Sequence, residues 1–128
     1  MKEAINVVEE AFKCYSKGKA IIPNRTQIIL FQGKSTALYM SGYSESIQSL
    51  GIKIVTVFPD NVYYGRKTTN ALVVLNGIKT GEPIALIEAN YLTELRRGAA
   101  SGVATKYLSR ENSRKLSIIG AGYQAKTN

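Results

Sequence analysis

TTNALVVLNGIKTGEPIALIEA, residues 68–89, is the stretch that decides the fold. Two runs rich in β-branched and aliphatic residues flank a turn that contains Asn76, Gly77 and Gly81. β-Branched and aliphatic residues favour strands, and a short loop that contains asparagine and glycine commonly joins two antiparallel strands. The stretch therefore predicts a β-hairpin.

Further strands precede this hairpin. GIKIVTVFPDN, residues 51–61, is a β-branched run bounded by Gly51 and Pro59. Upstream, the breaks at Pro23 and Gly33 leave β-rich runs at about 26–31 and 35–42, which predict a second hairpin. Five strands at hairpin spacing predict a mostly antiparallel sheet of five or six strands.

One helix is expected before the strands in the sequence and a second helix after them. Within residues 2–17, apolar residues recur at spacings of three and four: Ile5, Val8, Phe12 and Tyr15. Residues 91–108 show a second apolar face, formed by Leu92, Leu95, Ala99 and Val103, with Asn90 or Thr93 as the cap. The fold class is therefore α+β.

The second helix is rich in small residues: Gly98, Ala99, Ala100, Ser101, Gly102 and Ala104. Each glycine in a helix costs about 0.5–1 kcal/mol relative to alanine, so a compensating interaction is expected. Two explanations stay open: close helix packing, or the close approach of a ligand or a backbone segment.

Lys53 is a candidate for binding or catalysis. Alternation along residues 52–58 puts Lys53 on the same face as Val55 and Val57, while the other face is also largely apolar. Such a lysine either lies at a fraying strand end with its ammonium in water, or is a partly buried amine with a functional partner. In the second case it holds a carboxylate or transfers a proton.

Three arginines are candidates for binding anions. Arg25 follows Pro23 and Asn24 in a turn, and its planar fork suits a carboxylate. Arg96 and Arg97 lie on the helix of small residues, where neighbouring glycines leave access to an anion. For each arginine, simple solvation is the alternative.

The end of the chain carries a glycine motif. LSIIGAGYQAKTN, residues 116–128, predicts a short strand at 116–119 followed by Gly120, Gly122 and Ala125 in the pattern G-x-G-x-x-A. This pattern permits a tight turn and lets the backbone approach a pyrophosphate at a helix N-terminus. The full βαβ unit takes about thirty residues or more, and its acidic ribose ligand lies about twenty residues after the motif. Neither is contained in residues 1–128.

Composition narrows the chemistry. The 128 residues allow one complete domain and include no histidine and a single cysteine, Cys14, so a zinc site and a histidine-based triad are excluded within this chain. The first twenty residues contain no apolar run long enough for a signal peptide or a membrane span, so a cytoplasmic protein is expected.

The net charge is +8, and residues 94–128 hold 7 of the 17 basic and 2 of the 9 acidic residues. A solvated basic face is preferred over nucleic-acid binding as the explanation.

The residues also resemble a known family. TGEPIALIEANYLTELRRGAASGVATKYLSRENSRKLSIIGAGYQA, residues 80–125, is similar to the segment that joins the two domains of the ornithine cyclodeaminase and mu-crystallin family. PNR at 23–25 and GIKIVTVFPDN at 51–61 fit its N-terminal domain. The resemblance implies NAD(P)-linked chemistry on amino acids or imines, as in cyclodeaminases, archaeal-type alanine dehydrogenases and ketimine reductases. It also implies a homodimer paired through the N-terminal sheet.

The resemblance assigns roles to individual residues. Arg25 matches the arginine that binds the substrate carboxylate, and Lys53 matches the active-site lysine. Arg96 matches an arginine that approaches substrate and cofactor phosphate, while Arg97 stands where threonine or a similar residue is common. The dinucleotide loop corresponds to Gly120, Ala121, Gly122 and Gln124.

We therefore expect a substrate-binding and dimerisation domain at 1–108 and, at 109–128, a linker and the truncated start of an NAD(P)-binding Rossmann domain. The catalytic aspartate that the family requires is not in this chain. We expect residues 1–128 to bind no cofactor and to be inactive alone, with residues from Gly120 onward poorly ordered or packed against the preceding helix. The alternative is a non-catalytic dimeric binding or assembly protein from the same family.

Overall fold

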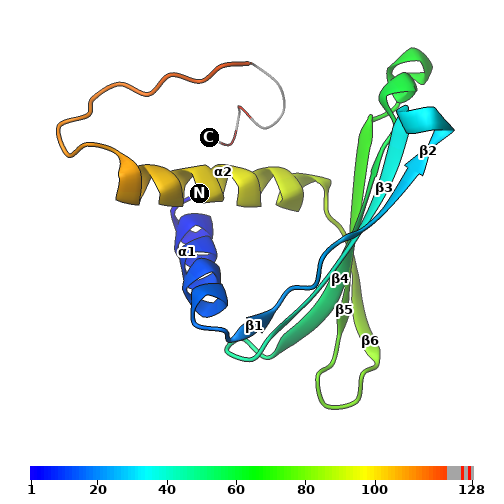
Figure 1. Cartoon of the computed structure of the whole chain (residues 1–128), viewed down its shortest axis with the longest axis horizontal. Helices are drawn as coiled ribbons and strands as arrows, with labels where there is room; N and C mark the ends of the chain where they lie inside the picture. Colours follow the sequence, from blue (N-terminus) through cyan, green and yellow to red (C-terminus); the bar gives the residue numbers. More distant parts are fainter. Residues whose placement is uncertain (121–124, 126, 128) are drawn as a thin grey trace. The chain divides into compact units, whose positions relative to one another are not determined.

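The computed structural model describes residues 1–120, 125 and 127 (Figure 1). The chain forms two compact units: Cys14–Asn90, and Met1–Lys13 together with Tyr91–Asn128. The first unit contains the sheet and the second contains most of both long helices. The division at residue 108 that the sequence predicts stays a prediction.

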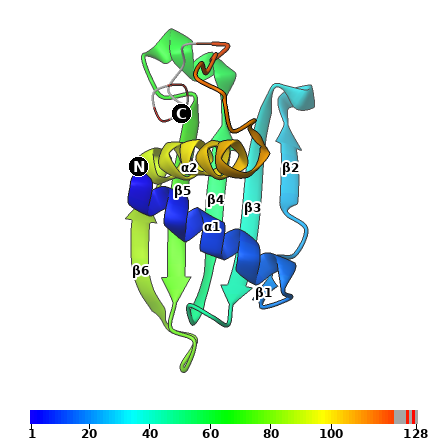
Figure 2. The same ribbon diagram turned by 90° about the vertical axis from the view of Figure 1, so that its left-hand side faces the viewer.

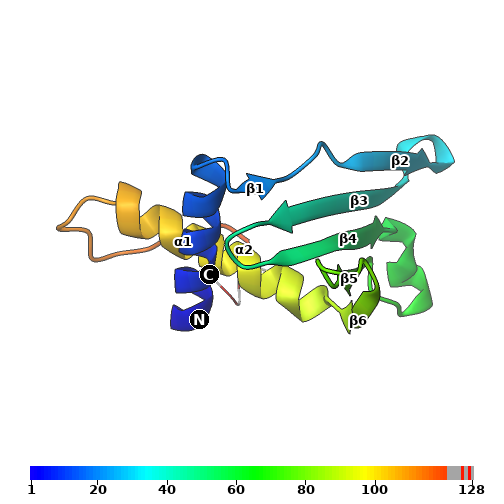
Figure 3. The same cartoon turned by 90° about the horizontal axis from the view of Figure 1, so that it is seen from below.

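The sheet has six strands, all paired antiparallel, in the order β1-β3-β4-β5-β6 with β2 also pairing with β3 (Figure 2). The strands are β1 Ala20–Ile21, β2 Thr26–Leu30, β3 Ser35–Ser44, β4 Ser49–Val57, β5 Thr69–Asn76 and β6 Pro83–Glu88. Figure 3 shows β1 and β2 lying one after the other along the same edge of β3. The α+β class and the predicted hairpins are confirmed.

The pairing register separates the two faces of the sheet. Leu38, Val55 and Ala71 lie opposite one another across β3, β4 and β5, so their side chains share a face. On this face Val55, Ala71 and Ala89 are buried and form the core of the unit, with four partly buried neighbours: Leu38, Met40, Val57 and Val73. The predicted alternation of β4 is therefore confirmed.

Tight turns close the hairpins with unusual backbone angles. Gly81, between β5 and β6, has a φ of 77°, a conformation that glycine adopts without strain. Between β2 and β3, by contrast, Phe31 and Gln32 take φ values of 51° and 56° although neither is glycine. A short 3-10 helix, η1 Phe31–Gly33, forms there, and a second, η2 Pro59–Tyr64, follows β4.

The helices begin and end close to the predicted positions: α1 is Lys2–Ser16 and α2 is Asn90–Leu108. The apolar stripe of α1 is only partly used, because Ile5 and Val8 are half-buried whereas Phe12 and Tyr15 remain more than half exposed, at 51% and 57%. On α2, Ala99 and Val103 are buried as expected. No helix in the described part of the chain is long and apolar enough to cross a membrane.

Neither predicted residue caps α2. Asn90 is the first residue of the helix, and its Oδ1 accepts a hydrogen bond of 2.7 Å from the backbone N–H of Ala71 in β5. Thr93 lies inside the helix, where its hydroxyl is buried and has no hydrogen-bond partner among the described residues. This bond lies within the sheet unit, to which Asn90 belongs.

The predicted strand at 116–119 is wrong. These residues have no regular secondary structure, and Ile119 is fully exposed. An apolar run becomes a strand only when a neighbouring strand satisfies its backbone groups, and the described residues provide no such neighbour here.

Candidate active site

Lys53 lies in the middle of β4, with strands paired on both sides. It is directly opposite Met40 of β3 and Val73 of β5. Its side chain is half-buried and shares the face of the sheet that carries buried Val55. The interpretation of Lys53 as a residue at a fraying strand end is therefore wrong, and the partly buried amine remains.

Arg25 reaches the same level of the sheet. It precedes Thr26, which pairs with Tyr39, so continuing the register by one residue places Arg25 level with Met40 and hence with Lys53. Only β3 separates the two positions, which corresponds to about 10 Å at the usual strand spacing. Arg25 itself is exposed. Two long cationic side chains at this separation suit a small anionic ligand held between their ends.

The surroundings of Lys53 strengthen such an interaction. Its nearest neighbours in the register, Met40 and Val73, are apolar and partly buried, and Val55 two residues along β4 is 5% exposed. Charges attract more strongly beside apolar groups than in bulk water. A carboxylate is therefore a better partner for this surface than a neutral group.

Arg96 lies in α2, within the second unit. Partial burial of its guanidinium lowers the pKa of Arg96, and repulsion from the adjacent Arg97 lowers it further, although the side chain as a whole remains exposed. No carboxylate of the described residues forms an ion pair with Arg96. A partly desolvated cation without an acidic partner favours the binding of an anion.

Part of the predicted dinucleotide loop can be described. Gly120 has a φ of 100°, which only glycine adopts readily and which fits the tight turn that the motif requires. Ala121, Gly122 and Gln124 lie outside the described residues. The assignment of these four positions to cofactor binding stays a prediction.

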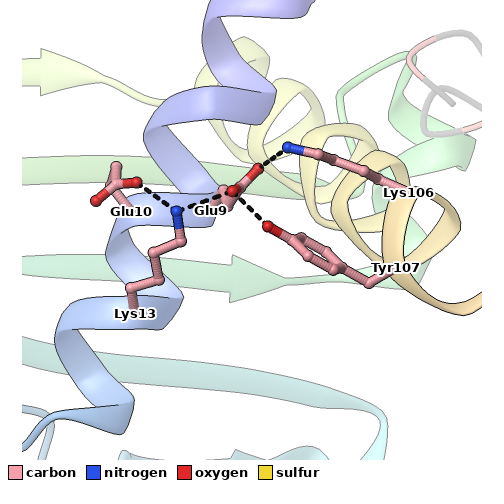
Figure 4. A network of polar contacts seen from close by, with 5 residues as sticks. All are labelled: Glu9, Glu10, Lys13, Lys106 and Tyr107. Atoms are coloured by element: carbon pink, nitrogen blue, oxygen red, sulfur yellow. Dashed lines mark hydrogen bonds and ion pairs between the residues drawn. The ribbon is translucent and has the colours of Figure 1, made fainter.

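One cluster of charges was not anticipated from the sequence (Figure 4). The carboxylate of Glu9 in α1 accepts hydrogen bonds of 2.6 Å from both Lys106 Nζ and Tyr107 Oη in α2, and it forms an ion pair of 2.9 Å with Lys13. Hydrogen bonds from Lys106, Tyr107 and Lys13 lower the pKa of Glu9 from 4.5 to about 2. The four-residue spacing of Glu9 and Lys13 could have indicated their ion pair on a helix. The partners in α2 are nearly a hundred residues away in the sequence, so nothing local indicated them.

Comparison with known proteins identifies the family. The sequence profile of the ornithine cyclodeaminase/mu-crystallin family matches residues 1–128, so the chain belongs to this family. It is 47% identical over 126 residues to the Δ1-pyrroline-2-carboxylate reductase of Bacillus thuringiensis subsp. konkukian, covering 98% of this chain and 39% of that protein. The resemblance seen in the sequence is thus confirmed.

Solved structures agree with this assignment. The Δ1-pyrroline-2-carboxylate reductase of Thermococcus litoralis, in complex with NADH and L-proline, superposes with a TM-score of 0.93 at 46% identity, covering 98% of this chain and 39% of that chain. An archaeal alanine dehydrogenase dimer with bound NAD gives a TM-score of 0.91 at 41% identity, covering 98% and 38%. The chain therefore spans about two fifths of the length of these relatives.

Proposed function

We propose that residues 1–128 form the substrate-binding and subunit-pairing part of an NAD(P)-dependent enzyme that acts on a small amino or imino acid. The observation that carries the proposal is the placement of Arg25 and Lys53 at one level of the sheet, one strand apart. The similarity to proteins whose structures contain NADH with L-proline, or NAD, supports the choice of substrate and cofactor class.

The chemistry follows from the two cations. The guanidinium of Arg25 donates two parallel hydrogen bonds to the substrate carboxylate. The ammonium of Lys53 either holds the same carboxylate from the other side or exchanges a proton with the substrate nitrogen. The family resemblance makes Arg96, in the other unit, a further candidate for binding the substrate or a cofactor phosphate. The nicotinamide, when bound, supplies or accepts the hydride.

Calorimetry with L-proline tests the binding role. The unaltered chain is expected to bind L-proline, and Lys53→Met, which keeps the length and removes the charge, is expected to bind it much more weakly. Lys79→Met, in the exposed turn before β6, serves as the matched control and should bind like the unaltered chain. Equal affinity in all three chains would contradict the role of Lys53.

We expect residues 1–128 not to catalyse the reaction by themselves. Hydride transfer requires the nicotinamide to be held about 3–3.5 Å from the reacting carbon. Relatives with bound dinucleotide are more than twice as long as this chain. NADH or NADPH with pyruvate and ammonia, or NAD with ornithine or L-proline, should therefore show no turnover, and clear turnover would contradict this expectation.

An assembly role is the second candidate, favoured by one observation. The sheet face opposite Lys53 exposes several apolar side chains, among them Ile28 at 45% and Leu86 at 70%. A patch of this kind marks an interface. We infer that the sheet pairs with that of a second copy, as a dimer is described for the archaeal alanine dehydrogenase. Dimerisation without L-proline binding would favour a purely structural role.

A further inference from the structure

Glycines inside α2 are explained by what lies next to them in their own unit. A Cβ at Gly102 would lie 2.7 Å from Cδ1 of Ile5, so this glycine allows α1 to pack closely. A Cβ at Gly98 would instead overlap the backbone carbonyl of Thr127. Both explanations for the small residues of α2 therefore hold, each at its own glycine: helix packing at Gly102, and the approach of a backbone segment at Gly98.

Two glycines inside the sheet differ in this respect, although they lie directly opposite each other: Gly42 of β3 and Gly51 of β4. A Cβ at Gly51 would lie 2.6 Å from the backbone carbonyl oxygen of Val74, so a close backbone approach requires glycine there. At Gly42 the nearest described atom is the carbonyl oxygen of Ile21, at 3.8 Å, which is an ordinary contact. Gly42 also has no positive φ, and the pairing of β3 with β4 passes through it without a shift in register. Neither packing nor backbone conformation explains this glycine.

A glycine in the interior of a strand weakens the strand, and it often marks a place where a ligand approaches the backbone closely. Gly42 follows Met40, the residue opposite Lys53, by two positions, so it belongs to the same face of the sheet as Lys53. The separation along the strand is about 7 Å. The open space above Gly42 therefore adjoins the proposed position of the substrate carboxylate.

Apolar residues flank this space on both sides. Leu75 of β5 lies opposite Gly51 and is half-buried. On the other side, continuing the register of β1 by one residue places Ile22 opposite Gly42, and Ile22 is 60% exposed. The row from Ile22 to Leu75 thus has two glycines in the middle, an apolar side chain at each end and no charged group. Such a row suits a hydrocarbon group better than a second charge.

We propose that Gly42 is a specificity-determining residue, which leaves room for the apolar carbon skeleton of a small amino or imino acid whose carboxylate is held by Arg25 and Lys53. The inference rests on the proposed function and narrows its substrate class to molecules such as L-proline. The ring of L-proline begins one bond from its carboxylate, so a molecule held at the level of Lys53 reaches the level of Gly42 with its ring.

Calorimetry that compares L-proline with free glycine tests this role, because free glycine has the same charged groups and no carbon skeleton beyond Cα. Each buried methylene group contributes about fourfold in affinity, so the unaltered chain should bind L-proline about tenfold more tightly than free glycine. Gly42→Val should reduce this ratio to about one, and Gly42→Ala should reduce it in part. Ser41→Val introduces the same side chain on the opposite face of β3 and should leave the ratio unchanged.

Urea unfolding of the same variants separates a binding role from a structural one. A Cβ fits at position 42, so Gly42→Ala should not lower the stability of the folded chain. A clear loss of stability in Gly42→Ala would show that the fold itself requires glycine and would overturn the inference.

The two proposals fail in different ways. An unchanged ratio in Gly42→Val, while Lys53→Met still loses L-proline binding, would overturn the role of Gly42 and leave the proposed function intact. An unaltered chain that binds neither L-proline nor free glycine would contradict the proposed function, and the role of Gly42 with it.

Discussion

The hydroxyls of Thr93 and Ser101 are treated differently within one helix. Ser101 Oγ donates to the carbonyl of Arg97, four residues before it, over 3.3 Å, as serine and threonine commonly do in helices. Thr93 has the same opportunity but is buried without a partner among the described residues. A buried hydroxyl without a hydrogen bond destabilises the folded state by about 1–3 kcal/mol.

Replacing this hydroxyl with a methyl group should stabilise the protein. We expect Thr93→Val, which preserves the shape of the side chain, to raise the free energy of unfolding by about 1 kcal/mol, because an unsatisfied polar group leaves the interior. Urea unfolding measures the change. Thr105→Val, at an exposed position of the same helix, is the control and should change little. A loss of stability in Thr93→Val would show that the hydroxyl has a partner.

The proposed role of Arg25 also depends on a single side chain. Hydrogen bonds to a charged group contribute about 1.5–3 kcal/mol, so Arg25→Ala should weaken L-proline binding about 10- to 150-fold. Arg66→Ala, which removes another exposed loop arginine of the same unit, should leave the affinity unchanged in the same calorimetric titration. Similar losses in both variants would indicate general charge attraction and not a specific contact.

At the scale of elements, Glu9 joins α1 to α2. Its carboxylate is surrounded by two ammonium groups and a phenol, and the contact of Ile5 with Gly102 lies one helical turn before it on α1. The two helices cross within their unit, as Figure 1 shows, so these two points fix their contact. The pairing of α1 with α2 therefore depends on one buried acid and one glycine.

The low pKa of Glu9 predicts how stability varies with pH. A carboxyl whose pKa is lowered on folding, here from 4.5 to about 2, stabilises the folded state above pH 4.5 and loses this contribution as the pH falls toward 2. The difference in stability between the unaltered chain and Glu9→Gln should thus be constant near neutral pH and shrink between pH 4.5 and 2. Urea unfolding across this range measures it. Glu10→Gln, which removes a more exposed acid that pairs with Lys13, should show little difference at any pH.

At the scale of the whole molecule, the sheet has two surfaces with different expected partners. One carries Lys53 and the buried core of its unit, and the other exposes Leu86, Ile28 and Leu50. Apolar side chains exposed on one face of a sheet are stabilised when a second sheet covers them. The surface opposite Lys53 is therefore the one proposed to pair with another copy.

A charge on this surface should prevent the pairing. Leu86→Glu is expected to convert a dimer into a monomer in sedimentation equilibrium, because an unpaired carboxylate would be buried at the interface. Leu108→Glu, at an exposed apolar residue of α2, is the control and should remain dimeric. A monomeric unaltered chain, or a dimer that survives Leu86→Glu, would contradict the proposed interface.

The sequence by itself determined most of the strands, both helices and the family. Alternation and turn residues act over a few neighbouring positions, so the hairpin at 68–89 and the shared face of Lys53 and Val55 were predictable. Contacts between distant segments were not: the level of Arg25 with Lys53, the cluster around Glu9 and the approach of Thr127 to Gly98 arise only when the chain is folded. The same reason explains the failed strand at 116–119, because a strand needs a neighbour that local sequence does not supply. Local patterns therefore determine the elements, and tertiary structure alone decides which side chains those elements bring together.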